Sequence, residues 1–323
     1  MKIAIIGAGL AGVSAARKLD NFAEVTVFEK SRGVSGRMST RRADAFEFDH
    51  GAQYFTAKDT RFQDAIEQGV AAGHLAPWAS NGVYLREGRL EPDTGANRFV
   101  SKPRMNSWVK ALAQGLDVRL ATRVSHIERR DDLWSLSFED GGSDHGFDWV
   151  IMAAPSEQVE AIFPKDFAQR TVLEAVKMDA CFALMLGLSG APNVPWDTLR
   201  QADGPAAWIA VNSAKPERPM GVATLMVHSG PQWSEDHIDD DRGDIAAQML
   251  SAASAVTGLN LSNPAYQTLH FWRYAAVKNG AGQGCLIDHD KQLIAAGDWC
   301  LGGRVEGAYL SGLATAEAII GAL

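Results

Sequence analysis

The feature that most constrains this 323-residue chain is a glycine-rich turn near its N-terminus. Three glycines form a GxGxxG pattern directly after the apolar run Ile3–Ile6 and open a helical pattern that ends near Leu19. The first glycine permits a tight turn, the second lets the backbone approach a pyrophosphate, and the third lets helix and strand pack closely. The helix N-terminus then offers free N–H groups to the phosphates. This order predicts a dinucleotide site, with these loop residues at the ligand: Gly7, Gly9, Leu10, Ala11 and Gly12.

An acidic residue follows at the expected distance. Glu29 closes the apolar run Val25–Glu29, where a carboxylate accepts hydrogen bonds from ribose hydroxyls. A carboxylate there disfavours a 2′-phosphate, so NADP is the least favoured occupant. The basic loop that follows holds Arg32, Gly33, Gly36 and Arg37, which suit a pyrophosphate but equally suit a solvated surface loop. These features alone do not separate NAD from FAD.

The C-terminal end favours FAD. Gly297 and Asp298 follow the apolar strand pattern Leu293–Ala296, and a second glycine turn leads to a helix expected over Gly307–Ala322. FAD is longer than NAD and needs an acceptor for its ribityl chain, which Asp298 can supply. The N-terminus of the last helix can face the N1–C2=O edge of the flavin ring, where its dipole favours negative charge. The alternative is that Asp298 only caps a helix in a surface turn.

Composition excludes several classes of function. A net charge of −8 and a pI near 5.5 argue against a nucleic-acid partner. The three cysteines are far apart, which predicts neither disulfides nor a metal site and is typical of a cytoplasmic protein. The apolar run Ile3–Ala16 could pass for a signal peptide, but its motif-spaced glycines favour a retained fold element. No other apolar stretch approaches the ~20 residues of a membrane span, so we expect no membrane partner.

The chain order predicts a discontinuous nucleotide-binding domain with an inserted domain. The βαβ start and the C-terminal return assign residues 1–60, 100–156 and 284–323 to an α/β, Rossmann-like FAD-binding domain. Residues 61–99 and 157–283, with many alternating runs and few helices, are assigned to a substrate domain with a mainly antiparallel sheet. Residues 30–49 are expected to form an extended loop. A ligand would bind between the two domains.

Several motifs add a family resemblance. Glu29–Gly33 with Gly36–Thr40 resembles the second FAD motif of the flavin amine oxidase superfamily, and Gly303–Ala308 resembles its C-terminal flavin motif. Within that superfamily the chain is most similar to the bacterial renalase-like group, through segments that span the whole chain: Asp49–Thr56, Lys102–Met105, Asn212–Arg218, His270–Ala275 and Gly297–Ala308. Ser35 departs from this pattern, because a second glycine usually stands before Gly36. Serine adds a hydroxyl there but constrains the backbone.

The resemblance implies a two-domain fold of the p-hydroxybenzoate-hydroxylase type (GR2) with non-covalent FAD. It implies an oxidase that converts isomeric 2- or 6-dihydro-NAD(P) to NAD(P)⁺ by hydride transfer to flavin N5, while O₂ reoxidises the flavin and gives H₂O₂. By position in the motifs, the further residues expected at FAD are Glu29, Lys30, Gly36, Arg37, Met38, Gly51, Ala52, Gln53, Tyr54, Val124, Ala153, Pro155, Asp298, Trp299, Arg304, Val305 and Ala308.

The substrate pocket is less constrained by the sequence. Hydride transfer needs stacking and a dry pocket more than an acid or base. The pocket candidates are Gln53, Tyr54, Trp208, Trp272 and Tyr274. By alternation, His270, Trp272 and Tyr274 share one strand face, although aromatic residues on a strand more often belong to the core.

Three cations are further candidates for the substrate. Lys215 and Arg218, with Arg273, could receive its phosphates, but a solvated loop explains the first two equally well.

Two other functions remain open at this point. A flavin amine oxidase would need an aromatic cage for a neutral amine, and Arg304 stands where such enzymes tend to place an aromatic residue. A non-catalytic flavoprotein would use FAD for folding or as a redox-sensing module. Both alternatives share the FAD site with the dihydro-NAD(P) oxidase, so they differ from it only in the substrate pocket.

Overall fold

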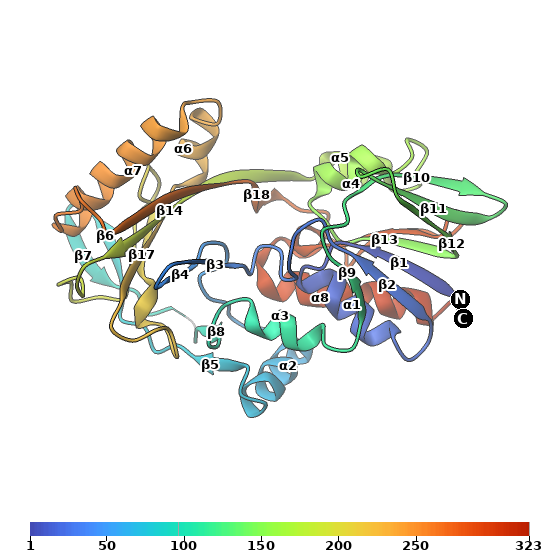
Figure 1. Cartoon of the computed structure of the whole chain (residues 1–323), viewed down its shortest axis with the longest axis horizontal. Coiled ribbons are helices and arrows are strands. Elements are labelled where there is room, and N and C mark those ends of the chain that lie inside the picture. The colour runs from blue at the N-terminus through green and yellow to red at the C-terminus, as the bar shows by residue number, and fades with distance from the viewer. Residues whose placement is uncertain (96, 323) are drawn as a thin grey trace.

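The computed structural model describes residues 1–95 and 97–322. Two large sheets stand at opposite ends of the molecule, and the long strands β14 (Lys177–Leu188) and β18 (Tyr266–Asn279) of the second sheet extend toward the first (Figure 1). Both termini lie beside the first sheet, as expected when a domain opens the chain and is completed by its end.

The first sheet has six strands, in the order β19-β20-β13-β1-β2-β9. Its strands pair in parallel except for β19, which runs antiparallel to β20. Parallel strands covered on both faces read as unbroken apolar runs, which explains the sequence of the central ones. The bounds are β1 (Lys2–Ile6), β2 (Glu24–Phe28), β9 (Asp117–Arg119), β13 (Trp149–Met152), β19 (Leu286–Asp288) and β20 (Leu293–Ala295).

Two different layers cover this sheet. Ile3 and Ile5 pack with helix α1 (Leu10–Leu19) and helix α8 (Arg304–Ile320) on one face. Ala4 and Ile6 face a three-stranded antiparallel sheet, whose bounds are β10 (Val124–Arg130), β11 (Leu133–Phe138) and β12 (Ser143–Phe147). Two short helices follow β13, namely α4 (Ser156–Ile162) and α5 (Arg170–Ala175). This arrangement confirms the Rossmann-like α/β fold.

The second sheet has seven strands, in the order β18-β14-β17-β16-β15-β6-β7. Every pairing is antiparallel except that of β6 with β15, so the mainly antiparallel prediction is confirmed. Helices α6 (Pro231–Asp236) and α7 (Arg242–Thr257) lie over its outer face (Figure 1). The remaining bounds are β6 (Gly82–Arg86), β7 (Arg89–Pro92), β15 (Thr198–Arg200), β16 (Trp208–Val211) and β17 (Ala223–His228).

The segment after the basic loop differs from the expectation for residues 30–49. It ends in a hairpin of β3 (Thr40–Ala43) and β4 (Phe46–Asp49), and the buried Phe48 packs against the inner face of the seven-stranded sheet. Burial of this apolar side chain stabilises a strand that the polar residues around it obscured in the sequence. The other small elements are α2 (Thr60–Ala71), β5 (Leu75–Pro77), β8 (Phe99–Ser101), α3 (Ser107–Leu112) and two 3₁₀ turns, Asn212–Ala214 and Asp298–Leu301.

The last helix begins earlier than the sequence indicates. α8 starts at Arg304, three residues before Gly307, because the positive-φ turn at Gly302 and Gly303 brings Arg304 directly into the first helical turn. In the described part of the chain no helix has both the length and the apolar character needed to cross a membrane. Across residues 1–95 and 97–322 there is also no group of three or more metal-ligating side chains placed to hold a metal ion.

Candidate functional site

A continuous cavity of about 2750 Å³ separates the two large sheets. The carboxyl ends of β1, β2 and β13 open into it through Ile6, Phe28 and Met152. Ligands of open α/β sheets bind at this edge. The volume exceeds the 300–1000 Å³ or so of a typical small-molecule pocket, so a dinucleotide and a second ligand can be held together.

The three motif glycines serve different purposes in the structure. A side chain at Gly7, whose φ is +107°, would collide with the carbonyl oxygen of Ala153, and one at Gly12 would collide with the carbonyl oxygen of Gly7. A Cβ at Gly9 would meet nothing within 4 Å, because Gly9 faces the cavity. Gly7 and Gly12 therefore allow the packing of the loop, while Gly9 leaves the space that a pyrophosphate requires at the N-terminus of α1.

Glu29 is buried at the end of β2 and lines the cavity. Its two carboxylate oxygens accept from the backbone N–H groups of Ala8, at 2.8 Å, and Ser31, at 2.7 Å. These bonds fix the carboxylate and leave further lone pairs for ribose hydroxyls. Val124, Pro155 and Lys30 line the cavity as well, and burial lowers the pKa of Lys30.

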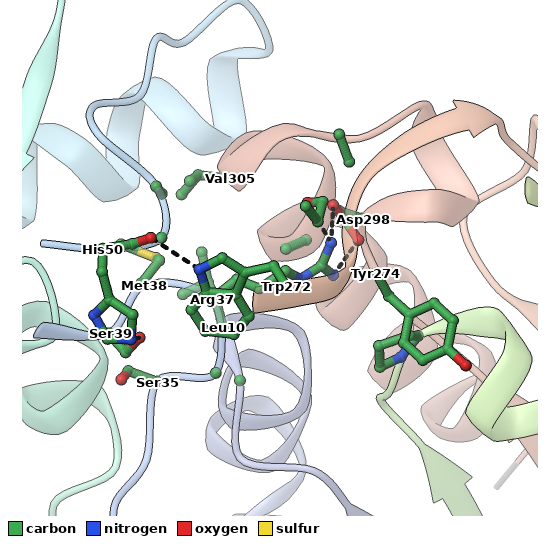
Figure 2. A pocket seen from close by; sticks show the side chains of 18 of the residues that line it. Leu10, Ser35, Arg37, Met38, Ser39, His50, Trp272, Tyr274, Asp298 and Val305 are labelled. Atoms are coloured by element: carbon green, nitrogen blue, oxygen red, sulfur yellow. Dashed lines mark hydrogen bonds and ion pairs between the residues drawn. The ribbon is translucent and has the colours of Figure 1, made fainter. Parts of the chain in front are cut away.

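Arg37 and Asp298 form a bidentate ion pair inside the cavity (Figure 2). Nη2 of Arg37 lies 2.6 Å from Oδ1 of Asp298 and Nη1 lies 3.0 Å from Oδ2, while Nη1 also donates to the carbonyl of Ala275. Asp298 is thus not a cap in a surface turn: its side chain is buried and faces the ligand space. Arg37 of the basic loop thus contacts both Ala275 on β18 and Asp298 in the C-terminal turn.

Ser35 sits beside the phosphate loop in a strained conformation. Its φ is +115°, in the region that favours glycine, and its N–H donates to the carbonyl of Ala8 at 2.8 Å. At Gly36, the next residue, an added Cβ would lie 3.3 Å from the Cα of Gly9, so a side chain there would crowd the phosphate loop. The backbone here follows the path that a glycine would adopt, although serine occupies the position.

Asp49 is fully buried and holds two cations. Its Oδ2 lies 2.6 Å from Nη2 of Arg218 and 3.2 Å from Nζ of Lys215, and these charges hold the pKa of Asp49 well below its usual range despite burial. Lys215 also donates to Gln53 and Asn212. The expectation that Lys215 and Arg218 receive substrate phosphates or lie in a solvated loop is wrong, because both are buried in this network.

Gln53 links this network to the loop that faces the cavity. Its Nε2 donates to the carbonyl oxygens of Asp49 and Gly51, and its Oε1 accepts from Lys215. A side chain at Gly51 would collide with the carbonyl oxygen of Arg37, so this glycine is required by backbone packing rather than by close approach to a ligand. The segment from Asp49 to Gln53 is consequently rigid, since a buried polar network fixes each turn of its backbone.

His50 and Trp272 form an aromatic cluster on one wall of the cavity (Figure 2). The Trp272 indole N–H donates to the His50 carbonyl at 2.8 Å, and the two rings stack with centroids 5.2 Å apart. His270 packs edge-on against both rings. The Nε2 of His50 lies 3.3 Å from the Ser39 hydroxyl, and its Nδ1 has no partner in the described part of the chain.

Tyr274 lies apart from that cluster. β18 bulges where it passes β14, so that three residues of β18 oppose the single Ala180 of β14 between the pairs Asp179–Ala276 and Cys181–Trp272. The bulge breaks the alternation on which the common face of His270, Trp272 and Tyr274 was predicted. Tyr274 still lines the cavity, but on the far side of the Arg37–Asp298 pair (Figure 2).

One register of the seven-stranded sheet supplies more of the cavity wall, and His270 of the aromatic cluster stands at one end of it. In this register, six neighbouring strands each contribute one residue to the same face of the sheet, directly opposite the residue of the next strand. Five of the six side chains line the cavity, and the sixth, Ala183, does not. We call these residues the cross-strand row: Tyr84, Arg200, Trp208, His228, Ala183 and His270. Sequence reasoning identified Trp208 and His270 but missed Tyr84, Arg200 and His228, because no local signal reveals which strands are neighbours.

Tyr54 reaches this row from the other domain. Its hydroxyl accepts from Nη2 of Arg200 at 2.8 Å, and its ring lies 5.6 Å from that of Trp208. The buried Arg98, paired with Asp93, stacks on the outer face of the Tyr54 ring at 4.5 Å. Tyr54 is therefore clamped between two guanidinium groups.

Most residues expected at the ligand line the cavity, with two exceptions. Gly12 packs inside the loop, and the Trp299 side chain is wholly buried in the core, where its indole N–H donates to the carbonyl of Ala154. The remaining expected residues all line it: Gly7, Gly9, Leu10, Ala11, Glu29, Lys30, Gly36, Arg37, Met38, Gly51, Ala52, Gln53, Tyr54, Val124, Ala153, Pro155, Trp272, Tyr274, Asp298, Arg304, Val305 and Ala308.

The cavity is positively charged although the whole chain is acidic. Thirteen lysine and arginine residues line it against seven aspartate and glutamate residues, an excess of six positive charges, whereas the chain carries −8. Burial, together with the neighbouring His270 and Arg41, lowers the pKa of His50 to about 3, and burial lowers that of His228 to about 4. Both rings are neutral at physiological pH, and the field favours anionic ligands.

A Rossmann-like sheet whose carboxyl edge faces a large cavity, closed by a second sheet with an aromatic wall, defines a two-domain flavin-binding oxidoreductase. Residues 5–68 match the NAD(P)-binding Rossmann-like domain family, and residues 84–320 match the family described as flavin containing amine oxidoreductase. The second match covers more than half of the chain. The protein belongs to the flavin-containing amine oxidoreductase family, and FAD is its cofactor.

Solved structures with the same fold span essentially the whole chain. A proposed protoporphyrinogen oxidase from Exiguobacterium sp. 255-15 aligns with a TM-score of 0.81 at 13% identity, covering 100% of this chain and 99% of that one. Reduced UDP-galactopyranose mutase aligns at 0.80 with 11% identity, covering 100% and 94%. Cyclohexylamine oxidase from Brevibacterium oxydans IH-35A aligns at 0.76 with 15% identity, covering 99% of both chains. Identities this low establish the fold alone.

A curated relative matches over a short region. A 4,4′-diapophytoene desaturase from Staphylococcus aureus (strain Newman) is 41% identical over 78 residues, which are 21% of this chain and 16% of the desaturase. The chain therefore matches about one sixth of that relative's length, and the match does not extend to the rest of either protein.

Proposed function

We propose that this chain is a renalase-like oxidase that converts isomeric dihydronicotinamide dinucleotides to NAD(P)⁺. The observation that carries the proposal is the charge of the cavity. FAD brings two negative phosphates, and the positive excess of six leaves further cations for an anionic substrate. An amine is cationic in solution and would be repelled by the same field.

The residues present fit the cofactor. Gly9 and the N-terminus of α1 would hold the pyrophosphate, Glu29 the adenosine ribose, and Asp298 with Arg37 the ribityl chain. FAD bound there would supply the hydride acceptor and pass two electrons to O₂. Dihydronicotinamide, O₂ and one proton would become oxidised nicotinamide and H₂O₂.

The protein's own part is to bind and to orient the substrate. Tyr54, Trp208 and Trp272 present aromatic rings on two walls of the cavity, against which a dihydropyridine ring can stack. His50 and His270, which burial and Arg41 keep neutral, line the wall without adding charge near the pyridinium product. A hydride donor requires this alignment and no proton transfer from the ring carbon.

Anaerobic mixing of the FAD-loaded protein with each reductant tests the proposal. The 2- and 6-dihydro isomers should bleach the bound flavin within seconds, and admitted O₂ should then yield H₂O₂ and NAD(P)⁺ in equal amounts. Benzylamine, putrescine and the 4-dihydro isomer serve as comparison reductants. Bleaching by an amine and not by the 2- or 6-dihydro isomers would overturn the proposal, and reduction by dithionite alone would favour a non-catalytic flavoprotein.

A further inference from the structure

Arg200 occupies an unusual position in the cross-strand row. It lies at the end of β15 between Tyr84 on β6 and Trp208 on β16, and its guanidinium carbon is 5.6 Å and 5.0 Å from the centroids of those two rings. The hydrogen bond from Nη2 to the Tyr54 hydroxyl fixes the end of the side chain. Three aromatic residues thus hold the guanidinium group in place while it faces the cavity.

The charge of Arg200 has no carboxylate partner. Within the described residues no aspartate or glutamate oxygen lies within 4.0 Å of it, whereas Arg98 pairs with Asp93 and Arg218 with Asp49. A guanidinium group carries five N–H donors. Among the described residues, Arg200 donates only one of them to another side chain, the hydroxyl of Tyr54. A half-buried cation with unused donors in a fork geometry is suited to a phosphate or carboxylate.

The position of Tyr54 relates Arg200 to the reacting ring. The backbone of Tyr54 directly follows the buried segment from Asp49 to Gln53, its side chain lines the cavity, and its hydroxyl accepts a hydrogen bond from Arg200. Arg200 is therefore one tyrosine side chain away from the place where a substrate ring would stack. In a nicotinamide nucleotide the ribose likewise separates the phosphate from the nicotinamide ring.

We propose that Arg200 determines specificity by binding a phosphate group of the nucleotide substrate, with Tyr54 and Trp208 holding its guanidinium group in the required orientation. The inference rests on the proposed function and names the residue that recognises the anionic part of that substrate. It also explains why an arginine with no carboxylate partner among the described residues stands among aromatic residues at this register. A neutral amine would gain nothing from this residue, and an ammonium ion would be repelled by it.

Anaerobic flavin reduction with a matched pair of substrates tests this role. Dihydronicotinamide mononucleotide and dihydronicotinamide riboside carry the same ring and differ in one phosphate. The wild-type protein should bind the mononucleotide about ten- to a hundredfold more tightly, as expected for a charge-assisted hydrogen bond. Arg200→Gln should lose this preference while its limiting rate of reduction at saturation stays within about twofold, and Arg200→Lys should restore part of the preference.

Arg86→Gln is the matched control. Arg86 lies two residues after Tyr84 on the same strand and stacks on its ring, but it pairs with Glu91 outside the cavity. Its variant should keep the wild-type preference for the mononucleotide. Equal loss of affinity for mononucleotide and riboside in Arg200→Gln would indicate a structural role and overturn the inference, as would an unchanged preference.

A second measurement does not depend on catalysis. Inorganic pyrophosphate is titrated calorimetrically into FAD-loaded wild-type, Arg200→Gln and Arg86→Gln proteins, in which FAD already fills the groove at Gly9. Binding to the wild type and to Arg86→Gln that is at least tenfold weaker in Arg200→Gln supports the anion subsite even if no dihydronicotinamide reduces the flavin, a result that would overturn only the proposed function. Equal binding to all three proteins overturns the subsite.

Discussion

Arg37 holds both carboxylate oxygens of Asp298, at 2.6 and 3.0 Å, although the two residues are 261 positions apart in the chain. The pair closes the cofactor groove at the point where the N-terminal and C-terminal parts of the first domain meet (Figure 2). Replacing either partner removes one charge from the cavity and leaves the other facing the cavity uncompensated.

Asp298→Asn should weaken FAD binding by about ten- to a hundredfold, because a hydrogen bond to a charged group contributes about 1.5–3 kcal/mol. The substitution keeps the shape of the side chain and removes its charge. Calorimetric titration of the apoprotein with FAD measures the change, and Asp290→Asn, at an exposed site near the same strands, is the control. An FAD affinity equal to that of the wild type would contradict the role assigned to Asp298.

The motif glycines should separate binding from folding. Gly9→Ala places a methyl group in open space, so the apoprotein should keep its free energy of unfolding within about 1 kcal/mol while FAD affinity falls at least tenfold. Gly12→Ala forces a methyl group against the carbonyl of Gly7 and should cost more than about 2 kcal/mol of unfolding free energy. Urea denaturation and FAD titration of both variants provide the two measurements. Similar stability losses in the two variants would show that Gly9 is also required for packing.

Ser35→Gly should stabilise the protein. Strain at a non-glycine residue with φ of +115° costs about 1–3 kcal/mol, which glycine would relieve. Glycine also raises the conformational entropy of the unfolded chain, which offsets part of this stabilisation. A net gain of about 1 kcal/mol is therefore expected in urea denaturation of the apoprotein. Ser31→Gly, in the same loop without positive φ, should instead lose stability. If Ser35→Gly is no more stable than the wild type, the hydroxyl of Ser35 must offset the strain.

The neutral histidines of the cavity should make the fold sensitive to acid. The pKa of His50 is about 3 and that of His228 about 4 in the folded state, below the ordinary value of about 6.5, so the unfolded chain binds more protons between these values. Their contribution is fully present above pH 6.5 and is lost as the pH falls, by up to about 1.4 kcal/mol per pH unit for each ring.

Urea denaturation of the apoprotein at pH 7, 6 and 5 measures this loss. Other charges that face the histidines are Arg41, near His50 and His270, and Lys215, near His228. His50→Gln should reduce the slope of the unfolding free energy against pH by the equivalent of about one proton taken up on unfolding. His145→Gln, at an exposed site, is the control for the substitution itself. A stability that is constant from pH 7 to 5 in the wild type would show that the histidines are already accessible to solvent protons.

Much of the site was predictable because its motifs are local. Gly9 and Glu29 follow from a strand, a turn and a helix within one βαβ unit, and Asp298 follows from the glycine turn after β20. Within the βαβ unit, a parallel pairing of β1 and β2 brings the strand ends at Gly7 and Glu29 together, so the local pattern is enough to place them. The seven-stranded sheet was predictable as a class from the alternation of its strands, although not in its order.

The neighbours of residues distant in the sequence were not predictable. From the sequence, Lys215 and Arg218 could equally bind substrate phosphates or lie in a solvated loop, but the fold buries both against Asp49. The bulge in β18 separates Tyr274 from Trp272. Composition and periodicity predict neither outcome, because strand register and buried ion pairs depend on contacts between segments that are far apart in the chain.

By itself the sequence determined the dinucleotide fold and the residues of its glycine loop, both of which depend on short-range backbone geometry. The tertiary structure alone decided which side chains form the substrate wall. The pairing of six strands places five of these side chains in one register, namely Tyr84, Arg200, Trp208, His228 and His270. The fold also gathers an excess of positive charge around the cavity of an otherwise acidic protein.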